Sequence, residues 1–330
     1  MDNTLLEVRG LKKKFGTSPG FLKHSQPKVH AVRGVDLKIF KGETLGLVGE
    51  SGCGKSTLSL LVLRLLKEDA GRIFFEGVDI TDYKRSELKD VRKRMQVVFQ
   101  NPYASLDPHM KAGEIIGEPL LVHNIVNSKD RKDMVLKLLE EVGLSSDSYD
   151  KYPFEFSGGQ RQRIGIARAL SLTPSLIVAD EPVSALDVSI RGGILNLFVE
   201  LQKKLSLTYL FISHDLKVVE HVSDRIIVMY LGKVVEEFAA SELMNARHPY
   251  TQALVSAIPV PVPGAKMKRI VPKGDVPSTT NPPKGCSFHP RCSYAKEICS
   301  IEEPKFVEIG KGHRAACHFI DKVGVISCKF

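Results

Sequence analysis

A glycine-rich stretch near residue 50 carries the residue types that hold phosphate groups. It fits the pattern G-x-x-x-x-G-K-[ST] with Gly49, Glu50, Ser51, Gly52, Cys53, Gly54, Lys55, Ser56 and Thr57. Glycines let a backbone curl tightly around a phosphate and direct several N–H groups toward it. The Lys55 amine can reach terminal phosphates, and the Ser56 hydroxyl can bind Mg²⁺. The stretch therefore predicts a site for a polyphosphate.

A second stretch, residues 156–181, joins an anion-binding helix start to two carboxylates. Its helix is expected to begin at a glycine pair, in the run Ser157, Gly158, Gly159 and Gln160. Free N–H groups and the helix dipole at such a start favour a negative charge. The apolar run 176–179 predicts a buried strand that ends at Asp180 and Glu181. Carboxylates in that position are suited to hold a metal ion and to activate a water.

Three apolar segments are expected to position these groups. Residues 43–48 predict a short buried strand before the phosphate loop, and residues 58–66 predict the helix after it. Residues 209–213 predict a later strand that ends at His214. A strand before the glycine pattern and a helix after it are the context that the pattern requires. The chain is therefore expected to be an α/β protein with the P-loop NTPase fold.

The ordered motifs resemble those of the ATP-binding subunits of ABC transporters. The resemblance implies an ABC ATPase core with an N-terminal antiparallel β part, an inserted helical subdomain and a small Cys-rich C-terminal module. We expect the core to comprise residues 1–100 and 167–255. Residues 101–166 would form the helical subdomain, which ends in the signature motif. Residues 256–330 would form a proline-rich arm and a cysteine-cluster module.

The resemblance also implies a role for each motif residue. Glu181 corresponds to the general base that polarises the attacking water, and Asp180 to a carboxylate associated with Mg²⁺. Gln100 corresponds to a glutamine that senses Mg²⁺ and links the site to the membrane subunits. His214 corresponds to a histidine that contacts the γ-phosphate. The signature motif matches Ser157, Gly158, Gly159 and Gln160, and the loop exchanged across a dimer matches Ser184, Ala185, Leu186 and Asp187.

Together these residues predict ATP hydrolysis. Phosphoryl transfer depends on charge neutralisation and in-line positioning more than on covalent chemistry. Lys55 and a Mg²⁺ ion held by Ser56 would neutralise the phosphates, while Glu181 orients the water. Adenine usually stacks on an aromatic side chain near the N-terminus of such proteins. Phe15 is the candidate and His30 the alternative, because residues 17–28 resemble an insertion.

Composition points to a soluble chain that stays in the cytoplasm, and the family resemblance implies that it lies at the inner membrane face. The 330 residues exceed one ATPase core of roughly 200–250 residues, so an appendage is expected. No apolar run reaches the ~18 residues of a membrane span, and the N-terminus lacks a signal-peptide layout. The net charge of +9 is scattered, without the aromatic–basic interleaving of single-strand binders. We expect a peripheral subunit on the cytoplasmic face of the cell membrane, with no nucleic-acid partner.

Three segments outside the ATPase motifs indicate which members of the family the chain resembles. Residues 101–108 resemble the segment after the glutamine in peptide-transporter members, and amphipathic helices are expected at 112–122 and 130–142. The HPYT segment at 248–251 is typical of oligopeptide and dipeptide ABC ATPases, including nickel-import relatives. Its proline also suits the first position of a helix within residues 241–258. Residues 259–290 are too rich in proline for a regular helix or sheet.

Five of the six cysteines fall within the last 45 residues. The spacing Cys286-x5-Cys292-x6-Cys299-x17-Cys317 offers four thiolates, and Cys328 is left over. Disulfides are not expected in a cytosolic chain. Structural zinc sites favour tighter C-x2–4-C pairs, whereas iron–sulfur clusters accept wider spacings, so the residues alone leave zinc and iron–sulfur open. The family resemblance implies a [4Fe–4S] cluster, with His289, His313 and His318 beside it or at the surface.

The leading hypothesis is the ATP-hydrolysing subunit of an importer for di- or oligopeptides, with nickel import as an alternative. A soluble ABC ATPase that acts on ribosomes or nucleic acid is the rival, and a subunit that binds ATP without turnover is a third possibility. The resemblance implies that the signature motif faces the phosphate loop of a second ATPase subunit. The expected partners are a homologous ATPase, or a second copy of the chain, and two integral membrane permeases. An extracytoplasmic substrate-binding protein would act indirectly.

Overall fold

The computed structural model describes residues 3–16, 28–125, 127–259 and 269–324 of the chain. The chain divides into two compact units, each built from segments that are distant in sequence. Unit 1 comprises residues 1–5, 39–44 and 80–213, and unit 2 comprises residues 6–38, 45–79 and 214–330. Most of the expected insertion at residues 17–28 lies outside the described residues.

Unit 1 contains three parallel strands, and the middle one, β7, ends at the expected carboxylates. The strands are adjacent in the order β8-β7-β6, with bounds Thr208–Ser213 for β8, Leu176–Asp180 for β7 and Met95–Val98 for β6. Val178 pairs with Leu210 on one side and with Val97 on the other. β7 and β8 are apolar and almost fully buried, which is typical of parallel strands covered on both faces. The shared direction brings the strands' carboxyl ends to one edge.

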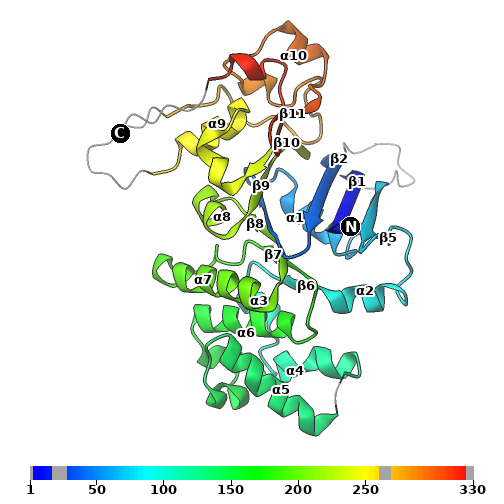
Figure 1. The fold of residues 1–330 in the computed structure, drawn as a ribbon, viewed down its shortest axis with the longest axis vertical. Helices are drawn as coiled ribbons and strands as arrows, with labels where there is room; N and C mark the ends of the chain where they lie inside the picture. Colours follow the sequence, from blue (N-terminus) through cyan, green and yellow to red (C-terminus); the bar gives the residue numbers. More distant parts are fainter. Residues whose placement is uncertain (1–2, 17–27, 126, 260–268, 325–330) are drawn as a thin grey trace, which may run out of the picture. The chain divides into compact units, whose positions relative to one another are not determined.

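Helices complete unit 1. Within it α4 packs against α5 and α6, and α6 also packs against α7 (Figure 1). The helices predicted from residues 112 and 130 are both present, the first with the expected bounds. The helical elements are α2 (Leu88–Arg94), α3 (Pro102–Ser105), α4 (Ala112–Val122), α5 (Ser128–Glu141), η1 (Ser146–Asp150), η2 (Pro153–Glu155), α6 (Gly158–Leu170) and α7 (Val188–Leu205).

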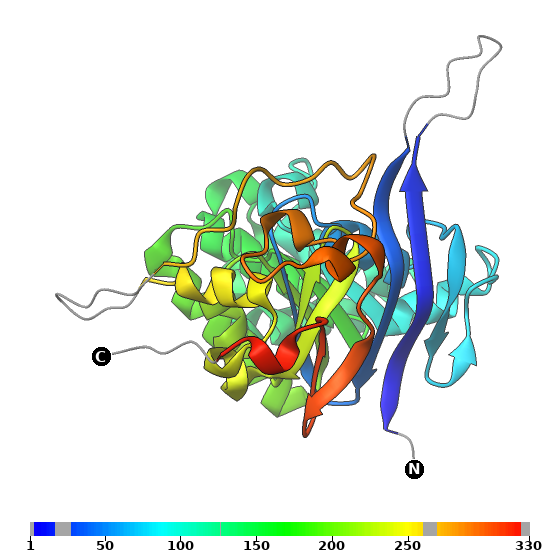
Figure 2. The ribbon, with the colours of Figure 1, turned by 90° about the horizontal axis from the view of Figure 1, so that it is seen from above.

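Unit 2 begins with a four-stranded sheet in the order β2-β1-β4-β5. Its strands are β1 (Thr4–Phe15), β2 (Val29–Phe40), β4 (Ala70–Phe75) and β5 (Val78–Asp79). β1 pairs with β4 in the antiparallel sense, and β4 with β5 likewise. Figure 2 shows β1 and β2 as two long strands side by side. The N-terminal antiparallel part expected from the sequence is therefore present.

A second group of strands in unit 2 carries the phosphate loop at one end. The strands are adjacent in the order β11-β12-β10-β9-β3, with β3 (Thr44–Val48) parallel to β9 and the other pairs antiparallel. Their bounds are Arg225–Tyr230 for β9, Lys233–Ala239 for β10, Phe306–Gly310 for β11 and His313–Ala316 for β12. The last two strands come from the cysteine-rich end of the chain. The cysteine-rich C-terminal part therefore extends this sheet and is not joined to it by a linker alone.

The remaining helical elements of unit 2 are short. They are α1 (Lys55–Val62), α8 (Leu216–Val222), η3 (Ala240–Asn245), α9 (Pro249–Ser256), η4 (His289–Arg291), α10 (Glu297–Ile301) and η5 (Ile320–Lys322). Residues 269–285 form neither helix nor strand, as their proline content predicts, and Figure 2 shows them as a long connection.

One predicted helix is shorter than its sequence pattern suggests. The helix after the phosphate loop ends at Val62 and not at Leu66, because Arg64 adopts a left-handed conformation with φ 53°. The helical stretch expected over residues 241–258, with an interruption at residues 248–251, is present as η3 and α9. Pro249 occupies the first turn of α9, where its missing N–H costs no hydrogen bond, as the sequence predicts.

Candidate functional site

The phosphate loop lies between β3 and α1 and depends on two glycines. Gly54 is the N-cap of α1 with φ 107°, a conformation that side chains disfavour. A Cβ atom there would lie 2.2 Å from the Ala31 carbonyl oxygen, and one at Gly49 would lie 2.2 Å from that of Met229. Neither position can take a side chain without moving backbone. Because Gly54 offers no side-chain cap, the first N–H groups of α1 have the arrangement that binds anions.

Lys55 is buried inside the curve of this loop. Its Nζ donates hydrogen bonds to the carbonyl oxygens of Gly49, at 2.8 Å, and Glu50, at 3.1 Å. The backbone of the loop therefore holds the amine in place. Phosphate oxygens can replace these two carbonyl oxygens as acceptors. Cys53 is buried beside it, and burial raises the pKa of its thiol above the ordinary value. Cys53 thus acts as a small apolar filler of the loop.

Gln100 and Glu181 meet at the carboxyl edge of the strands in unit 1. The Gln100 Nε2 atom donates a hydrogen bond of 3.2 Å to the Glu181 carboxylate. Glu181 adopts φ 48°, which is uncommon outside glycine, and its N–H donates to the Ile212 carbonyl of β8 at 2.9 Å. Asp180 is the last residue of β7. The tertiary fold therefore brings together Gln100 and Glu181, which are 81 residues apart.

The turn after Glu181 is held by backbone and side-chain contacts. The Ser184 hydroxyl donates to the Glu181 carbonyl at 3.0 Å, and Arg191 donates to the carbonyls of Leu186, at 2.8 Å, and Ser184. Asp187 then begins α7 as its N-cap. The segment from Ser184 to Asp187 is thus a defined turn within unit 1.

The signature residues form the start of α6. Ser157 is the N-cap, and its hydroxyl accepts a hydrogen bond from the Gln160 N–H while the Gln160 side chain accepts one from the Ser157 N–H. This reciprocal capping box fixes the helix start. Gly159 faces α7, where a Cβ atom would lie 2.5 Å from Ile190 Cγ2. A glycine is needed here for close packing of α6 on α7.

The other residues that the sequence predicts for nucleotide binding and hydrolysis are divided between the two units. His214 directly follows β8, and it belongs to unit 2 together with the phosphate loop. Phe15 is the last residue of β1, and its side chain is exposed, as a stacking platform must be. His30 lies in β2, where its N–H donates to the Thr279 carbonyl at 2.9 Å. Unit 1 holds the other predicted residues, which are Gln100, Ser157, Gly158, Gly159, Gln160, Asp180, Glu181 and Asp187.

The four spaced cysteines line one small cavity in unit 2. Aromatic side chains and histidines complete its wall, and the lining residues are Cys286, Cys292, Cys299, Cys317, His248, Pro249, Phe288, His289, Tyr294, His318 and Phe319. Burial, and to a lesser extent the neighbouring thiols, raise the pKa of the Cys286 and Cys317 thiols to about 11 each. Thiols in such surroundings stay protonated near neutral pH unless a cation binds them.

The cavity does not have the geometry of a site for a single ion. Among the described residues, no group of three or more His, Cys, Asp or Glu side chains is arranged to hold one metal ion. A tetrahedral zinc with Zn–S bonds of about 2.3 Å would need its four sulfurs within about 4 Å of one another. Cys328 lies outside the described residues.

The three histidines near the cysteines already have hydrogen-bond partners. His289 Nδ1 lies 2.9 Å from the Cys286 carbonyl oxygen, and His318 Nε2 lies 3.0 Å from that of Glu302. His313 Nε2 contacts the fully buried carboxylate of Glu236 at 2.9 Å. In each of the three histidines, one ring nitrogen therefore contacts a carbonyl or carboxylate oxygen.

Two side chains that sequence reasoning missed contact the phosphate loop. The Glu50 N–H donates a hydrogen bond of 2.8 Å to the Tyr250 hydroxyl, and Arg291 donates to the Glu50 carboxylate at 3.0 Å. Tyr250 belongs to the HPYT segment, which the sequence singles out as a family marker and a helix start but not as a contact of the phosphate loop. Nothing in the local sequence of Arg291 indicates a partner 241 residues earlier.

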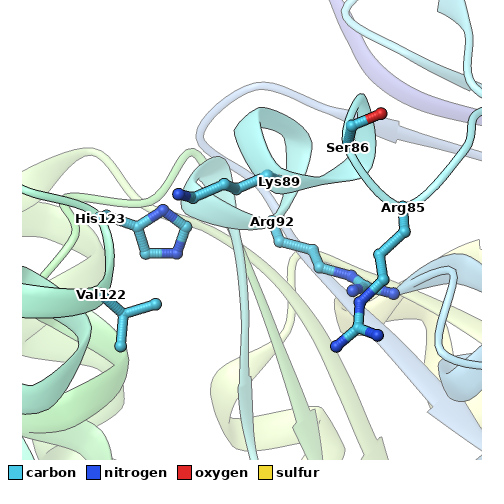
Figure 3. A pocket seen from close by; sticks show the side chains of 6 residues that line it. All are labelled: Arg85, Ser86, Lys89, Arg92, Val122 and His123. Carbon is cyan, nitrogen blue, oxygen red and sulfur yellow. The ribbon is translucent and has the colours of Figure 1, made fainter.

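A basic pocket lies between α2 and the end of α4 in unit 1. Its volume is about 510 Å³, and its lining residues are Arg85, Ser86, Lys89, Arg92, Val122 and His123. Figure 3 shows Lys89 extending toward His123 and Arg92 extending toward Arg85. Burial, then Lys93 and Lys89, lower the pKa of His123, whose buried Nδ1 has no hydrogen-bond partner within the described structure. Exposed apolar side chains continue along the same helix end at Leu121, Val122 and Ile125.

Known families match two parts of the chain. Residues 32–184 match the ABC transporter family, and residues 235–299 match the C-terminal region of oligopeptide/dipeptide transporters. The first range contains the phosphate loop, Gln100, the signature motif and both carboxylates. The second contains the HPYT segment and three of the four spaced cysteines.

Curated relatives match nearly the whole chain. The oligopeptide transport ATP-binding protein AppF of Bacillus subtilis is 53% identical over 319 residues, which cover 96% of this chain and 97% of that protein. The chain belongs to the ATP-binding subunits of oligopeptide and dipeptide ABC transporters. The dipeptide transport ATP-binding protein DppF of Haemophilus influenzae is 47% identical over 323 residues, 97% of this chain and 98% of that protein.

Solved ABC cassettes share the fold. A dimeric post-hydrolysis state of the ATP-binding cassette MJ0796, bound to ADP and Pi, is 28% identical with a TM-score of 0.64. It covers 72% of this chain, and the match spans 99% of that cassette. CbiO1 of Clostridium perfringens, part of the ABC transporter complex cbiONQ, is also 28% identical with a TM-score of 0.62, over 73% of this chain and 90% of that one.

These similarities confirm the predicted ABC ATPase fold and ATP hydrolysis as the activity of the family. They also confirm the predicted peptide-transporter family. Cassettes of this kind act as dimers and, in importers, with membrane permeases. Within the described residues, every helix is too short or too polar to cross a membrane.

Proposed function

We propose that this subunit hydrolyses ATP to drive the import of oligopeptides or dipeptides. The single observation that carries this is identity of about 50% with oligopeptide and dipeptide transport ATP-binding proteins along nearly the full chain. A complete set of hydrolytic residues supports turnover rather than ATP binding alone. The substrate-binding protein and the permeases would select the peptide.

The ATPase residues would have separate roles that depend on their charge. Lys55 and the N–H groups around Gly49 and Gly54 would bind the β- and γ-phosphates, with Mg²⁺ held by Ser56, Gln100 and Asp180. Glu181 would orient and polarise the attacking water, and His214 would contact the γ-phosphate. The remaining loop and stacking residues would be Ser51, Gly52, Cys53, Thr57 and Phe15, with His30 as the alternative stacking residue.

We propose the domain boundaries that the sequence predicts. The ATPase core would comprise residues 1–100 and 167–255, and residues 101–166 the helical subdomain. The cysteine-rich module would occupy residues 256–330. Ser157, Gly158, Gly159, Gln160 and Asp187 would act on the nucleotide of a second ATPase subunit, either a homologue or another copy.

The permeases would contact the basic pocket between α2 and α4. Positive charge at Arg85 and Lys89 fits an acidic segment, and exposed Leu121 and Val122 add apolar contact area. This contact would hold the subunit at the cytoplasmic face of the membrane. Lys89→Glu should reduce copurification with the permeases, whereas Lys203→Glu, an exposed change on α7, should not.

Copurification from membranes tests the importer function. Tagged protein should retain two integral membrane proteins after mild detergent extraction, and added peptide-loaded binding protein should stimulate its ATP hydrolysis. If the subunit copurifies with ribosomes and without integral membrane proteins, the alternative of a soluble ribosome-associated ATPase replaces this proposal. Stimulation by nickel-loaded and not by peptide-loaded binding protein would assign it to nickel import.

The cysteine cavity would hold a [4Fe–4S] cluster through Cys286, Cys292, Cys299 and Cys317. Four thiols around one cavity with an aromatic wall fit such a group, which suits a protected, largely apolar site. When bound, it would supply a rigid four-way link among short segments that bury little core. Anaerobically purified protein should be brown, with equal amounts of iron and sulfide, and Cys292→Ser should lose both. A colourless protein with one zinc per chain would refute this assignment in favour of the zinc alternative.

A further inference from the structure

Glu50 of the phosphate loop is held by two side chains from the C-terminal part of unit 2. Its backbone N–H donates to the Tyr250 hydroxyl at 2.8 Å. The Arg291 Nη1 atom lies 3.2 Å and 3.0 Å from the two oxygens of the Glu50 carboxylate. One residue of the loop is therefore fixed at both its backbone and its side chain.

These contacts are shielded from water. Tyr250 is fully buried, and the Arg291 and Glu50 side chains are 10% and 28% exposed. An ion pair so placed is screened less than one at the surface. Glu50 also stands in a loop that receives anionic phosphates, where an unpaired carboxylate would repel the ligand. Arg291 removes this repulsion because it neutralises the carboxylate.

Arg291 takes its position from the cysteine segment, which we define as residues 286–317. It ends the turn η4, and the two cavity cysteines Cys286 and Cys292 flank that turn. The His289 N–H donates to the Cys286 carbonyl at 3.0 Å, and the Cys292 N–H donates to the His289 carbonyl at 3.2 Å. The geometry around the thiols therefore determines where the Arg291 side chain begins.

Aromatic packing makes this connection rigid. Phe288, between the same two cysteines, lies edge-on to Tyr230 with ring centroids 5.3 Å apart, and it packs on Tyr250 at 5.4 Å. Tyr230 and Tyr250 are themselves in contact at 4.6 Å. All three rings are buried, so a shift of the cysteine segment would be transmitted to the Tyr250 hydroxyl that holds Glu50.

A second connection joins the cysteine segment to the other side of the loop. Arg33 donates to the Ser287 hydroxyl at 2.9 Å and to the Leu231 carbonyl at 3.3 Å. The next residue, Gly232, donates its N–H to the Cys53 carbonyl at 2.8 Å. The segment therefore reaches the phosphate loop by two separate routes, at Glu50 and at Cys53.

We propose that Arg291 is a positioning residue for ATP, through which the cysteine segment sets the affinity of the phosphate loop for nucleotide. Arg291 neutralises Glu50 and holds the loop in the shape that binds phosphate. Loss of the geometry around the cysteines would displace Arg291 and expose the Glu50 charge to the ligand. This inference rests on the proposed function, because it takes ATP as the ligand of the loop.

Titration of the full-length subunit with ATP and Mg²⁺ tests the proposal. Arg291→Met should raise the Kd for ATP about tenfold, since it leaves an unpaired carboxylate beside the phosphates. Adding Glu50→Gln to Arg291→Met should restore most of the affinity, because the repelling charge is then gone. Arg314→Met removes an exposed arginine of the same segment and should leave the affinity unchanged.

The cysteine arm of the test uses Cys292→Ser alone and in combination with Glu50→Gln. Cys292→Ser should weaken ATP binding when Glu50 is present and much less when Glu50→Gln is added. Circular dichroism and thermal unfolding of each variant separate this charge effect from loss of folding, since a misfolded loop would not regain affinity through Glu50→Gln.

Two results would overturn the proposal. One is wild-type affinity in Arg291→Met, and the other is a double variant that binds ATP as weakly as Arg291→Met alone. A wild-type subunit that fails to bind ATP would instead refute the proposed function. The wild-type titration distinguishes that failure from the other two.

Discussion

Lys55 and Glu181 are each held by neighbours within their own unit. The Lys55 amine is fixed by the carbonyls of the phosphate loop, and the Glu181 carboxylate by the Gln100 amide. Groups that are positioned in advance need little reorganisation when charge develops in a transition state. The left-handed backbone of Glu181 fits this pattern, because strained conformations concentrate at functional sites.

Glu181→Gln should separate ATP binding from hydrolysis. The amide cannot take part in proton transfer from the attacking water, so kcat should fall by at least about 100-fold. The Kd for ATP should stay within about twofold, because the phosphate contacts come from other residues. Phosphate release and equilibrium titration measure the two quantities. Glu200→Gln, an exposed change on α7, is the control, and an unchanged rate in Glu181→Gln would refute the assigned base.

At the scale of elements, α6 links the signature motif to the rest of unit 1. Its capping box fixes where the helix begins, and Gly159 allows α7 to approach closely. α6 also contains Gly165, where an added Cβ would meet nothing within 4 Å. The two glycines therefore have different physical roles on one helix.

Alanine substitutions at these two glycines should have opposite effects on stability. Gly159→Ala should lower the free energy of unfolding by about 2 kcal/mol, because its Cβ overlaps Ile190. Gly165→Ala should raise it by about 1 kcal/mol, because alanine is the better helix former. Chemical denaturation measures both changes. Ile190→Ala should recover part of the loss in Gly159→Ala, and equal effects at the two positions would contradict this account of α6.

At the scale of the whole molecule, the subunit is proposed to carry residues for more than one nucleotide site. Solved relatives with the same fold are dimeric cassettes, including one bound to ADP and Pi. Ser157 begins α6 and is proposed to act on the nucleotide of a partner, whereas Lys55 and Glu181 serve the subunit's own. The chain is therefore expected to complete its chemistry only when paired.

Ser157→Arg should uncouple ATP binding from association. The isolated variant should bind ATP with a Kd within about twofold of wild type, because Ser157 is proposed to act on the partner's nucleotide. ATP-dependent association with a second ATPase subunit should be lost, as sedimentation velocity would show with and without ATP. Loss of the serine cap should cost about 1 kcal/mol of stability, which a thermal unfolding control would record. Unchanged association would argue against this assignment.

Local sequence patterns are enough to place the phosphate loop, the signature helix start and most of the helices and strands. Each of these depends on residues only a few positions apart, such as Gly49 and Lys55, so local backbone geometry fixes them. The apolar pattern predicted the wrong end for α1, because the left-handed backbone of Arg64 ends the helix before the apolar run ends.

Which distant side chains share a site is visible only in the folded chain. The Gln100–Glu181 hydrogen bond, the Arg291–Glu50 ion pair and the common cavity of the four cysteines each join residues far apart in the chain. Bringing such distant residues together costs conformational entropy, which the packed core as a whole must offset. A short stretch of sequence therefore does not predict these contacts. The sequence therefore predicts ATP hydrolysis, whereas the fold shows that the cysteine-rich end contacts the phosphate loop.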